Sequence, residues 1–139
     1  MSEPVIRFTR GVPSPETFPK ARLAECTALA LDKYGDFVLQ YGPPGGFPGL
    51  RQWIAAESGV EEGRTIIGQG SLQLQDMLAR IVLQPGDLVY VEEPTYDRAV
   101  TILRRSGARA VGFPLGADGP DVEEIERRLK GGERPKLFY

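Results

Sequence analysis

Residues 85–96 read PGDLVYVEEPTY, and this stretch decides the fold class. Its first three residues form a tight turn, because proline fixes φ, glycine frees it and aspartate bonds its own backbone. The run 88–91 is short, apolar and rich in β-formers, which is typical of a strand covered on both faces. Pro94 ends the ladder, so Tyr96 follows the carboxyl end of the strand, where ligands bind in open α/β sheets.

Strand and helix patterns alternate on both sides of this stretch. We expect further strands at 65–67, 110–113 and 136–139, separated from one another and from the strand at 88 by helices over 71–82, 97–106 and 118–130. Ser71 is placed to cap the first of these helices. The order β-α-β-α-β-α-β predicts right-handed crossovers and a parallel sheet, and therefore an α/β fold.

Upstream of residue 65 the sequence predicts helices and loops. Prolines in residues 1–18 favour an extended arm without a helix. Pro19 opens a helix that we expect to stop at Gly35, and a loop follows over residues 41–49. A second helix is expected to start at Pro48 and to end at Ser58-Gly59.

Composition narrows the function classes. The chain has 139 residues, 41% hydrophobic and 26% charged, as in an ordinary soluble domain, and its net charge of −2 predicts neither a nucleic-acid nor a membrane partner. One cysteine and no signal peptide favour a cytoplasmic setting. The absence of histidine excludes His-based metal sites and Ser-His or Cys-His catalysis from this segment.

The fourth strand ends the chain at its most apolar point, Leu137 to Tyr139. Domain termini usually lie at the surface in polar segments. We therefore expect this chain to be the N-terminal piece of a longer protein.

The pattern PGD-x-V-x-x-E-x-P-x-Y in residues 85–96 resembles the class I and II aminotransferases, pyridoxal-phosphate (PLP) enzymes of fold type I. The resemblance runs from about Arg7 to Tyr139. It implies that the chain holds an extended arm and part of the parallel-sheet large domain. It also implies that Tyr96 lies against the cofactor ring.

The turn Gly68-Gln69-Gly70-Ser71 is the second matching stretch. A helix N-terminus offers unpaired N–H groups and partial positive charge to a phosphate. From the residues alone, a plain turn with a serine cap is the simpler interpretation. In family members similar to the aminoadipate and kynurenine enzymes the turn reads Gly-Ser-Gln-Gln and holds the PLP phosphate. Gly70, Ser71 and Gln73 match, and Leu72 replaces the first glutamine, so the backbone donors remain but one side-chain hydrogen bond is expected to be lost.

Two more stretches match the family. Tyr41 begins a Tyr-x-x-x-x-Gly signature, and the resemblance implies that it reaches across a dimer interface to the partner's cofactor phosphate. Gly11 and Pro13 match an arm that passes the substrate carboxylate, with Arg10 in place of a glycine. We hypothesise that Arg10 favours acidic substrates; a solvated arginine on an extended arm is the alternative.

The resemblance implies PLP as cofactor, an amino acid and a 2-oxo acid as substrates, and a homodimer. The amino acid would be 2-aminoadipate, aromatic or branched-chain. Residues 1–40 would form the arm and helix of the small-domain or dimer region, and 41–139 an incomplete PLP-binding large domain cut in its fourth strand. In the family the Schiff-base lysine, the aspartate at the pyridine nitrogen and the carboxylate-binding arginine all follow this segment. We therefore assign no catalytic residue and expect the segment alone to be inactive.

Two other functions remain open at this point. The chain also resembles the effector domain of regulators that join a winged helix to an aminotransferase-like body, and Gly70-Ser71 would suit a non-catalytic phosphate-binding fragment. Fold type I separates the strand at 65–67 from the other three by later strands. We therefore expect the isolated chain not to be stably folded in the family geometry.

Overall fold

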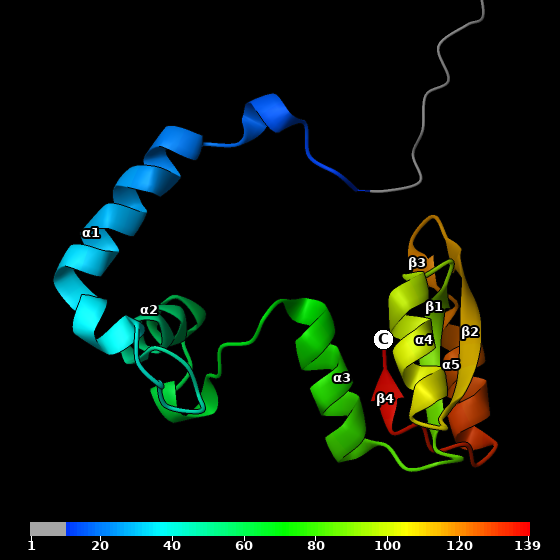
Figure 1. The fold of residues 1–139 in the computed structure, drawn as a ribbon. Helices are drawn as coiled ribbons and strands as arrows, with labels where there is room; N and C mark the ends of the chain where they lie inside the picture. The colour runs from blue at the N-terminus through cyan, green and yellow to red at the C-terminus, as the bar shows by residue number, and fades with distance from the viewer. Residues whose placement is uncertain (1–10) are drawn as a thin grey trace, which may run out of the picture. The chain divides into compact units, whose positions relative to one another are not determined.

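The computed structural model describes residues 11–139, which divide into two compact units between Ile66 and Ile67 (Figure 1). Arg10 and the arm before it lie outside the described residues. The predicted division at residue 40 refers to the parts of a complete enzyme and stays a prediction.

The first unit holds the helices η1 (Pro15–Thr17), α1 (Lys20–Val38), α2 (Pro48–Ser58) and η2 (Glu62–Arg64). The short η1 turn corrects the prediction of a helix-free arm. Helix α1 begins after Pro19 as expected, but the predicted stop at Gly35 is wrong. One glycine costs a helix only about 1 kcal/mol, and the Leu39 N–H still bonds the Gly35 carbonyl at 3.1 Å.

The end of α2 confirms its prediction. Gly59 lies in the left-handed region at φ 65°, and its N–H bonds back to carbonyls of the last helical turn. Within this unit the Phe47 ring packs edge-on against Tyr34 and Phe37, with ring centroids 5.1 and 5.7 Å away. This aromatic contact joins α1 to the start of α2.

The second unit is an α/β layer structure. It contains α3 (Ser71–Val82), β1 (Leu88–Glu93), α4 (Asp97–Arg105), β2 (Arg109–Gly116), β3 (Gly119–Pro120), α5 (Val122–Lys130) and β4 (Leu137–Phe138). The strand order is β3-β2-β1-β4, with β1 parallel to both β2 and β4. Three of the four predicted strands and their parallel pairing are confirmed.

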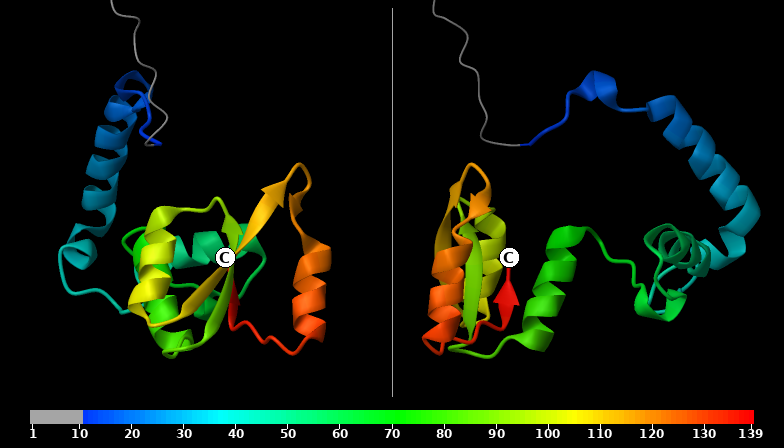
Figure 2. Two further views of the ribbon diagram at one scale, coloured as in Figure 1. Left: turned by 90° about the vertical axis from the view of Figure 1, so that its right-hand side faces the viewer. Right: turned by 180° about the vertical axis from the view of Figure 1, so that it is seen from behind.

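Strand β1 is buried on both faces, as its apolar run predicts. Val89 and Val91 pack with α3 and α4, whereas Leu88 and Tyr90 face Phe113 and α5. Figure 2 shows α4 and α5 on opposite sides of the strands. The core of this unit therefore sits on the two faces of one central strand.

The predicted strand at 65–67 is wrong, since these residues pair with no strand among residues 11–139. A strand needs a neighbour for its ladder, and the Thr65 carbonyl instead accepts a hydrogen bond from Arg51. Gly119 and Pro120, expected to start a helix, instead form β3, antiparallel to the end of β2. The sheet is therefore mixed, and the helix starts only after Asp121.

Among residues 11–139, no helix combines the length and the apolar character that crossing a membrane requires.

Candidate functional site

The turn before α3 is open at its glycine. Gly70 occupies the N-cap position with φ 93°, and nothing lies within 4 Å of where a Cβ would project. Ser71 is the first helical residue and makes no capping hydrogen bond, so its predicted capping role is wrong. A side chain at position 70 would be strained by this backbone conformation.

Helix α3 begins with the backbone N–H groups of Ser71, Leu72 and Gln73. Helix geometry leaves them without acceptors inside α3, and its first turn carries no acidic residue. The helix dipole adds partial positive charge at this end. Free donors, positive potential and open space fit a phosphate group.

Gln73 has a role that the sequence did not reveal. Its Oε1 accepts a hydrogen bond of 2.7 Å from the Gln69 N–H, which closes the turn over four residues. The contact uses the side chain of Gln73 and leaves its N–H free for a ligand. The Gln73 side chain therefore stabilises the turn before α3.

Tyr96 lies where the sequence predicts, beyond the carboxyl end of β1. It occupies the N-cap position of α4, three residues after Glu93, and its side chain is 55% exposed. In Figure 1 the β4 arrow, parallel to β1, points to the end of this unit at which α3 starts. Tyr96 and the α3 turn therefore lie at the same end of the sheet.

The other predicted site residues belong to the first unit or lie before it. The Tyr41 side chain is fully exposed in the loop after α1. Gly11 is exposed with nothing within 4 Å of a projected Cβ. The structure thus brings Gly70, Ser71, Leu72 and Tyr96 to one end of one sheet, whereas Tyr41 and Gly11 belong to the first unit.

A hollow of about 450 Å³ lies between α4 and the ends of β1 and β2. Glu93, Arg104 and Gly112 are among the residues that line it. Tyr96 and the α3 turn do not line this hollow, so we do not assign the phosphate to it. Among residues 11–139, no group of three or more His, Cys, Asp or Glu side chains is placed to hold a metal ion.

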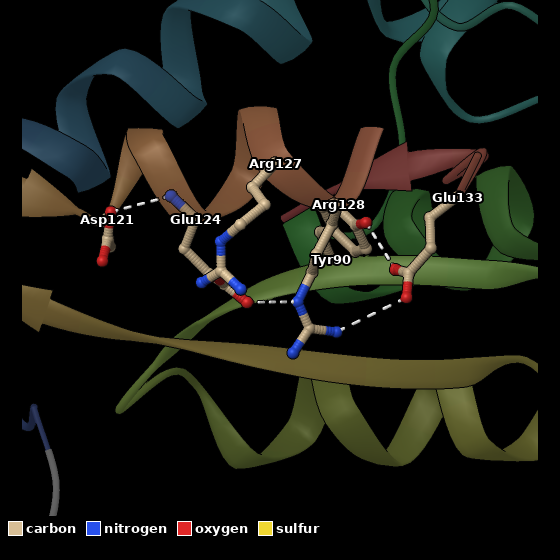
Figure 3. Close-up of polar contacts among 6 residues, drawn as sticks. All are labelled: Tyr90, Asp121, Glu124, Arg127, Arg128 and Glu133. Carbon is tan, nitrogen blue, oxygen red and sulfur yellow. Dashed lines mark hydrogen bonds and ion pairs between the residues drawn. The ribbon is translucent and has the colours of Figure 1, made fainter. Parts of the chain in front are cut away.

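A buried hydroxyl anchors the opposite face of the sheet (Figure 3). Tyr90 is 1% exposed, and its hydroxyl donates a 2.6 Å hydrogen bond to Glu133 Oε2. Burial raises the pKa of Tyr90, and the hydrogen bond to Glu133 and the negative charge of that carboxylate raise it further, against the opposing charges of Arg128 and Arg109. Tyr90 is therefore a neutral donor at physiological pH.

Arg128 connects this hydrogen bond to helix α5. Its Nη1 lies 3.6 Å from Glu133 Oε1, and its Nε donates a 2.7 Å hydrogen bond to Glu124 Oε1. Arg127 also pairs with Glu124 (Figure 3). The Arg128 guanidinium lies over the Phe113 ring. These charged side chains thus meet at the hydroxyl of a buried tyrosine, which no short sequence pattern connects to them.

The model of the family "Aminotransferase class I and II" matches residues 3–138. The chain belongs to this family. The 2-aminoadipate transaminase of Thermus thermophilus is 37% identical over 135 residues, which cover 97% of this chain and 34% of that protein. This aminotransferase segment therefore spans about a third of the length of such relatives.

Solved aminotransferases share its fold. LysN, an α-aminoadipate aminotransferase from Thermus thermophilus, was solved with N-(5'-phosphopyridoxyl)-L-leucine; the match has a TM-score of 0.87 at 38% identity and covers 95% of this chain and 34% of that one. The kynurenine aminotransferase of Pyrococcus horikoshii gives a TM-score of 0.81 at 34% identity, covering 94% of this chain and 34% of that one. The resemblance read from the sequence, to fold type I aminotransferases near the aminoadipate and kynurenine enzymes, is confirmed.

Proposed function

We propose that the protein carrying this chain is a PLP-dependent aminotransferase that moves an amino group between an amino acid and a 2-oxo acid. One observation carries the proposal: an open glycine turn with free N–H donors starts α3 at the ligand-binding end of the sheet, in a chain of the aminotransferase family. The relatives at 37% and 38% identity described above are aminotransferases, which favours this function over a regulator's effector domain.

Different residues of the chain bind different parts of the cofactor. The backbone N–H groups of Ser71 and Leu72, opened by Gly70, bind the phosphate. Tyr96 stacks on the ring, which fixes the ring plane by dispersion and quadrupole attraction. Tyr41 contributes from the partner of a homodimer. When bound, PLP supplies the electron sink for loss of a proton from the amino-acid α-carbon.

The substrate class that we propose is taken from the names of the similar aminotransferases. We propose 2-aminoadipate, an aromatic or a branched-chain amino acid, with Gly11 and Arg10 on the arm that passes the substrate carboxylate. Residues 1–40 serve the small-domain or dimer region and 41–139 the large domain. The setting we propose is the cytoplasm.

The test is cofactor binding by the complete protein. Apo-protein titrated with PLP should develop an absorbance band that changes when an amino acid is added. Gly70→Ala should abolish tight binding, because a side chain at φ 93° displaces the turn and fills the phosphate site. Gly132→Ala is the matched control: its φ is 100°, and it lies beyond α5, away from the turn.

Each outcome is decisive. A band that responds to amino acids, lost in Gly70→Ala and kept in Gly132→Ala, supports an aminotransferase with its phosphate at α3. A band that ignores amino acids supports the non-catalytic phosphate-binding alternative. Absence of any PLP-dependent band contradicts the proposal.

A further inference from the structure

Arg51 makes contacts that its place in α2 does not explain. It lies in the first turn of the helix, where the dipole disfavours a cation by about 0.3–1 kcal/mol. Its side chain is nevertheless only 18% exposed. A cation drawn into such a position must be held by contacts outside the helix.

Those contacts are two backbone carbonyls further along the chain. Arg51 Nε donates a 2.7 Å hydrogen bond to the Thr65 carbonyl, and Nη2 donates one of 2.8 Å to the Glu62 carbonyl. The Glu62 carboxylate lies 3.8 Å from Nη1 and adds a weaker attraction. The guanidinium fork therefore fixes the segment after α2, a task that suits arginine and not lysine.

The same guanidinium lies flat against Gly45. A Cβ built on Gly45 would meet Nη1, Cζ and Nε at 3.2, 3.3 and 3.4 Å, so three atoms of the plane approach the glycine almost equally. Arg51 thus clamps two segments: the loop before α2 on one face, and the carbonyls of Glu62 and Thr65 at its edge.

The clamped loop is the one that presents Tyr41. Because the Tyr41 side chain is fully exposed, the main chain alone sets its position. That main chain is held at three points: the Gly46 N–H bonds the Pro43 carbonyl at 2.9 Å, Phe47 packs against Tyr34, and Gly45 rests on Arg51. The third contact packs the loop at Gly45 against a guanidinium that hydrogen bonds hold to the Glu62 and Thr65 carbonyls.

We propose that Arg51 is a positioning residue for Tyr41, acting through Gly45. The inference rests on the proposed function, in which Tyr41 binds the PLP phosphate. Arg51 itself touches no cofactor; it reduces the loop's freedom, so that Tyr41 is presented in one place. Losing the clamp should weaken PLP binding by way of Tyr41.

The experiment is a double-mutant cycle on PLP affinity in the complete protein. We expect Arg51→Lys to raise the Kd for PLP by up to about tenfold, because its effect cannot exceed the loss of the one charge-assisted hydrogen bond that Tyr41 would make to the phosphate. Tyr41→Phe should raise it as well, and Arg51→Lys should add almost nothing in the Tyr41→Phe background. That non-additivity is what a merely structural role would not produce.

Matched controls come from the same unit. Arg64 is exposed, so Arg64→Lys should leave the affinity unchanged. Should Arg51→Lys fail to fold by circular dichroism, Gly45→Ala replaces it, because its Cβ would push the guanidinium without removing it. Gly63→Ala is the control for that change, since nothing lies within 4 Å of its projected Cβ.

The outcomes separate this inference from the proposed function. If the unsubstituted protein binds no PLP, the proposed function fails. If it binds PLP and Arg51→Lys leaves the affinity unchanged, the Arg51 inference alone is overturned. If Tyr41→Phe leaves the affinity unchanged, the role proposed for Tyr41 is overturned together with the Arg51 inference, while PLP binding by the protein stands. An effect of Arg51→Lys that persists in full beside Tyr41→Phe also overturns it, because Arg51 would then act independently of Tyr41.

Discussion

The Tyr90 hydroxyl donates a 2.6 Å hydrogen bond to the Glu133 carboxylate, 43 residues further along the chain. The bond joins the central strand β1 to the segment between α5 and β4. Arg128 lies beside the same carboxylate and over the Phe113 ring, so strand, helix and loop meet at one buried hydroxyl. These contacts between distant segments fix how α5 lies on the sheet.

Replacing Tyr90 by phenylalanine should destabilise the protein without changing its fold. The ring keeps its packing, but Glu133 loses its donor and the hydroxyl's bond is not replaced. We expect a lower urea midpoint and faster amide hydrogen exchange in residues 131–136. Tyr139→Phe is the control, because its hydroxyl has only a long 3.5 Å contact with Gln75. Equal effects of the two changes would refute a special role for Tyr90.

The raised pKa of Tyr90 predicts a loss of stability in alkali. Its ordinary value is 10.0, and in the folded protein burial and Glu133 hold the pKa above that value. The unfolded chain therefore releases this proton first as the pH rises. The Tyr90 contribution to the free energy of unfolding is present in full below about pH 10 and is lost as the pH rises through the folded pKa. Urea unfolding across this range should show the decline, and the Tyr90→Phe protein should show less of it; parallel curves would contradict the assignment.

The second unit was largely predictable, because its elements carry local signals. Strand β1 is apolar on both faces, and β1 and α4 are separated by Pro94. The helix α5 was expected over 118–130 and is present, although it begins later, where the Asp121 side chain accepts a hydrogen bond from the Glu124 N–H. Each of these features depends on neighbours within a few residues.

The features that were missed depend on distant partners. Residues 65–67 have the composition of a strand, but pairing requires another strand, and the Thr65 carbonyl is taken by Arg51. The hydrogen bond from Tyr90 to Glu133 and the clamp of Arg51 on Gly45 likewise join residues that no short pattern connects. Among the candidate site residues, Gly70 is proposed from its turn, whereas the hydrogen bond from the Gln69 N–H to the Gln73 side chain depends on how the turn folds.

Gly107→Ala should be strongly destabilising. Gly107 has φ 79°, and a Cβ there would lie 3.0 Å from both Cα and Cβ of Pro85. We expect a cost of about 1–3 kcal/mol from the backbone conformation, with the collision in addition. Gly132→Ala is the control. Its φ of 100° is as unfavourable for alanine as that of Gly107, but nothing lies within 4 Å of its projected Cβ. Chemical denaturation should rank Gly107→Ala as the costlier change; the reverse order would show that the Pro85 contact relaxes freely.

Asp121→Ala should loosen the start of α5. Asp121 Oδ1 accepts a 2.9 Å hydrogen bond from the Glu124 N–H, a side-chain cap whose loss costs about 1 kcal/mol. Hydrogen exchange should accelerate at Glu124 and in the first turn of the helix. Asp118→Ala, an exposed position in the turn before β3, should leave that exchange unchanged. Unaltered protection at Glu124 in the Asp121 variant would show that the cap does not stabilise the helix.

Leu72→Gln should tighten PLP binding. Leu72 stands where the resemblance to the family implies a glutamine. It is 39% exposed and lies in the first turn of α3 beside the open Gly70. An amide there would add a donor to the phosphate that we propose at this turn, and one hydrogen bond to a charged group is worth about a tenfold change in Kd. Ile81→Gln is the matched control, because it adds the same amide at the far end of the same helix, where Ile81 is 77% exposed. PLP titration of the apo forms of the complete protein measures both changes. A tighter Kd for Leu72→Gln alone supports the phosphate position at α3, whereas equal affinities for all three proteins would place the phosphate out of reach of residue 72.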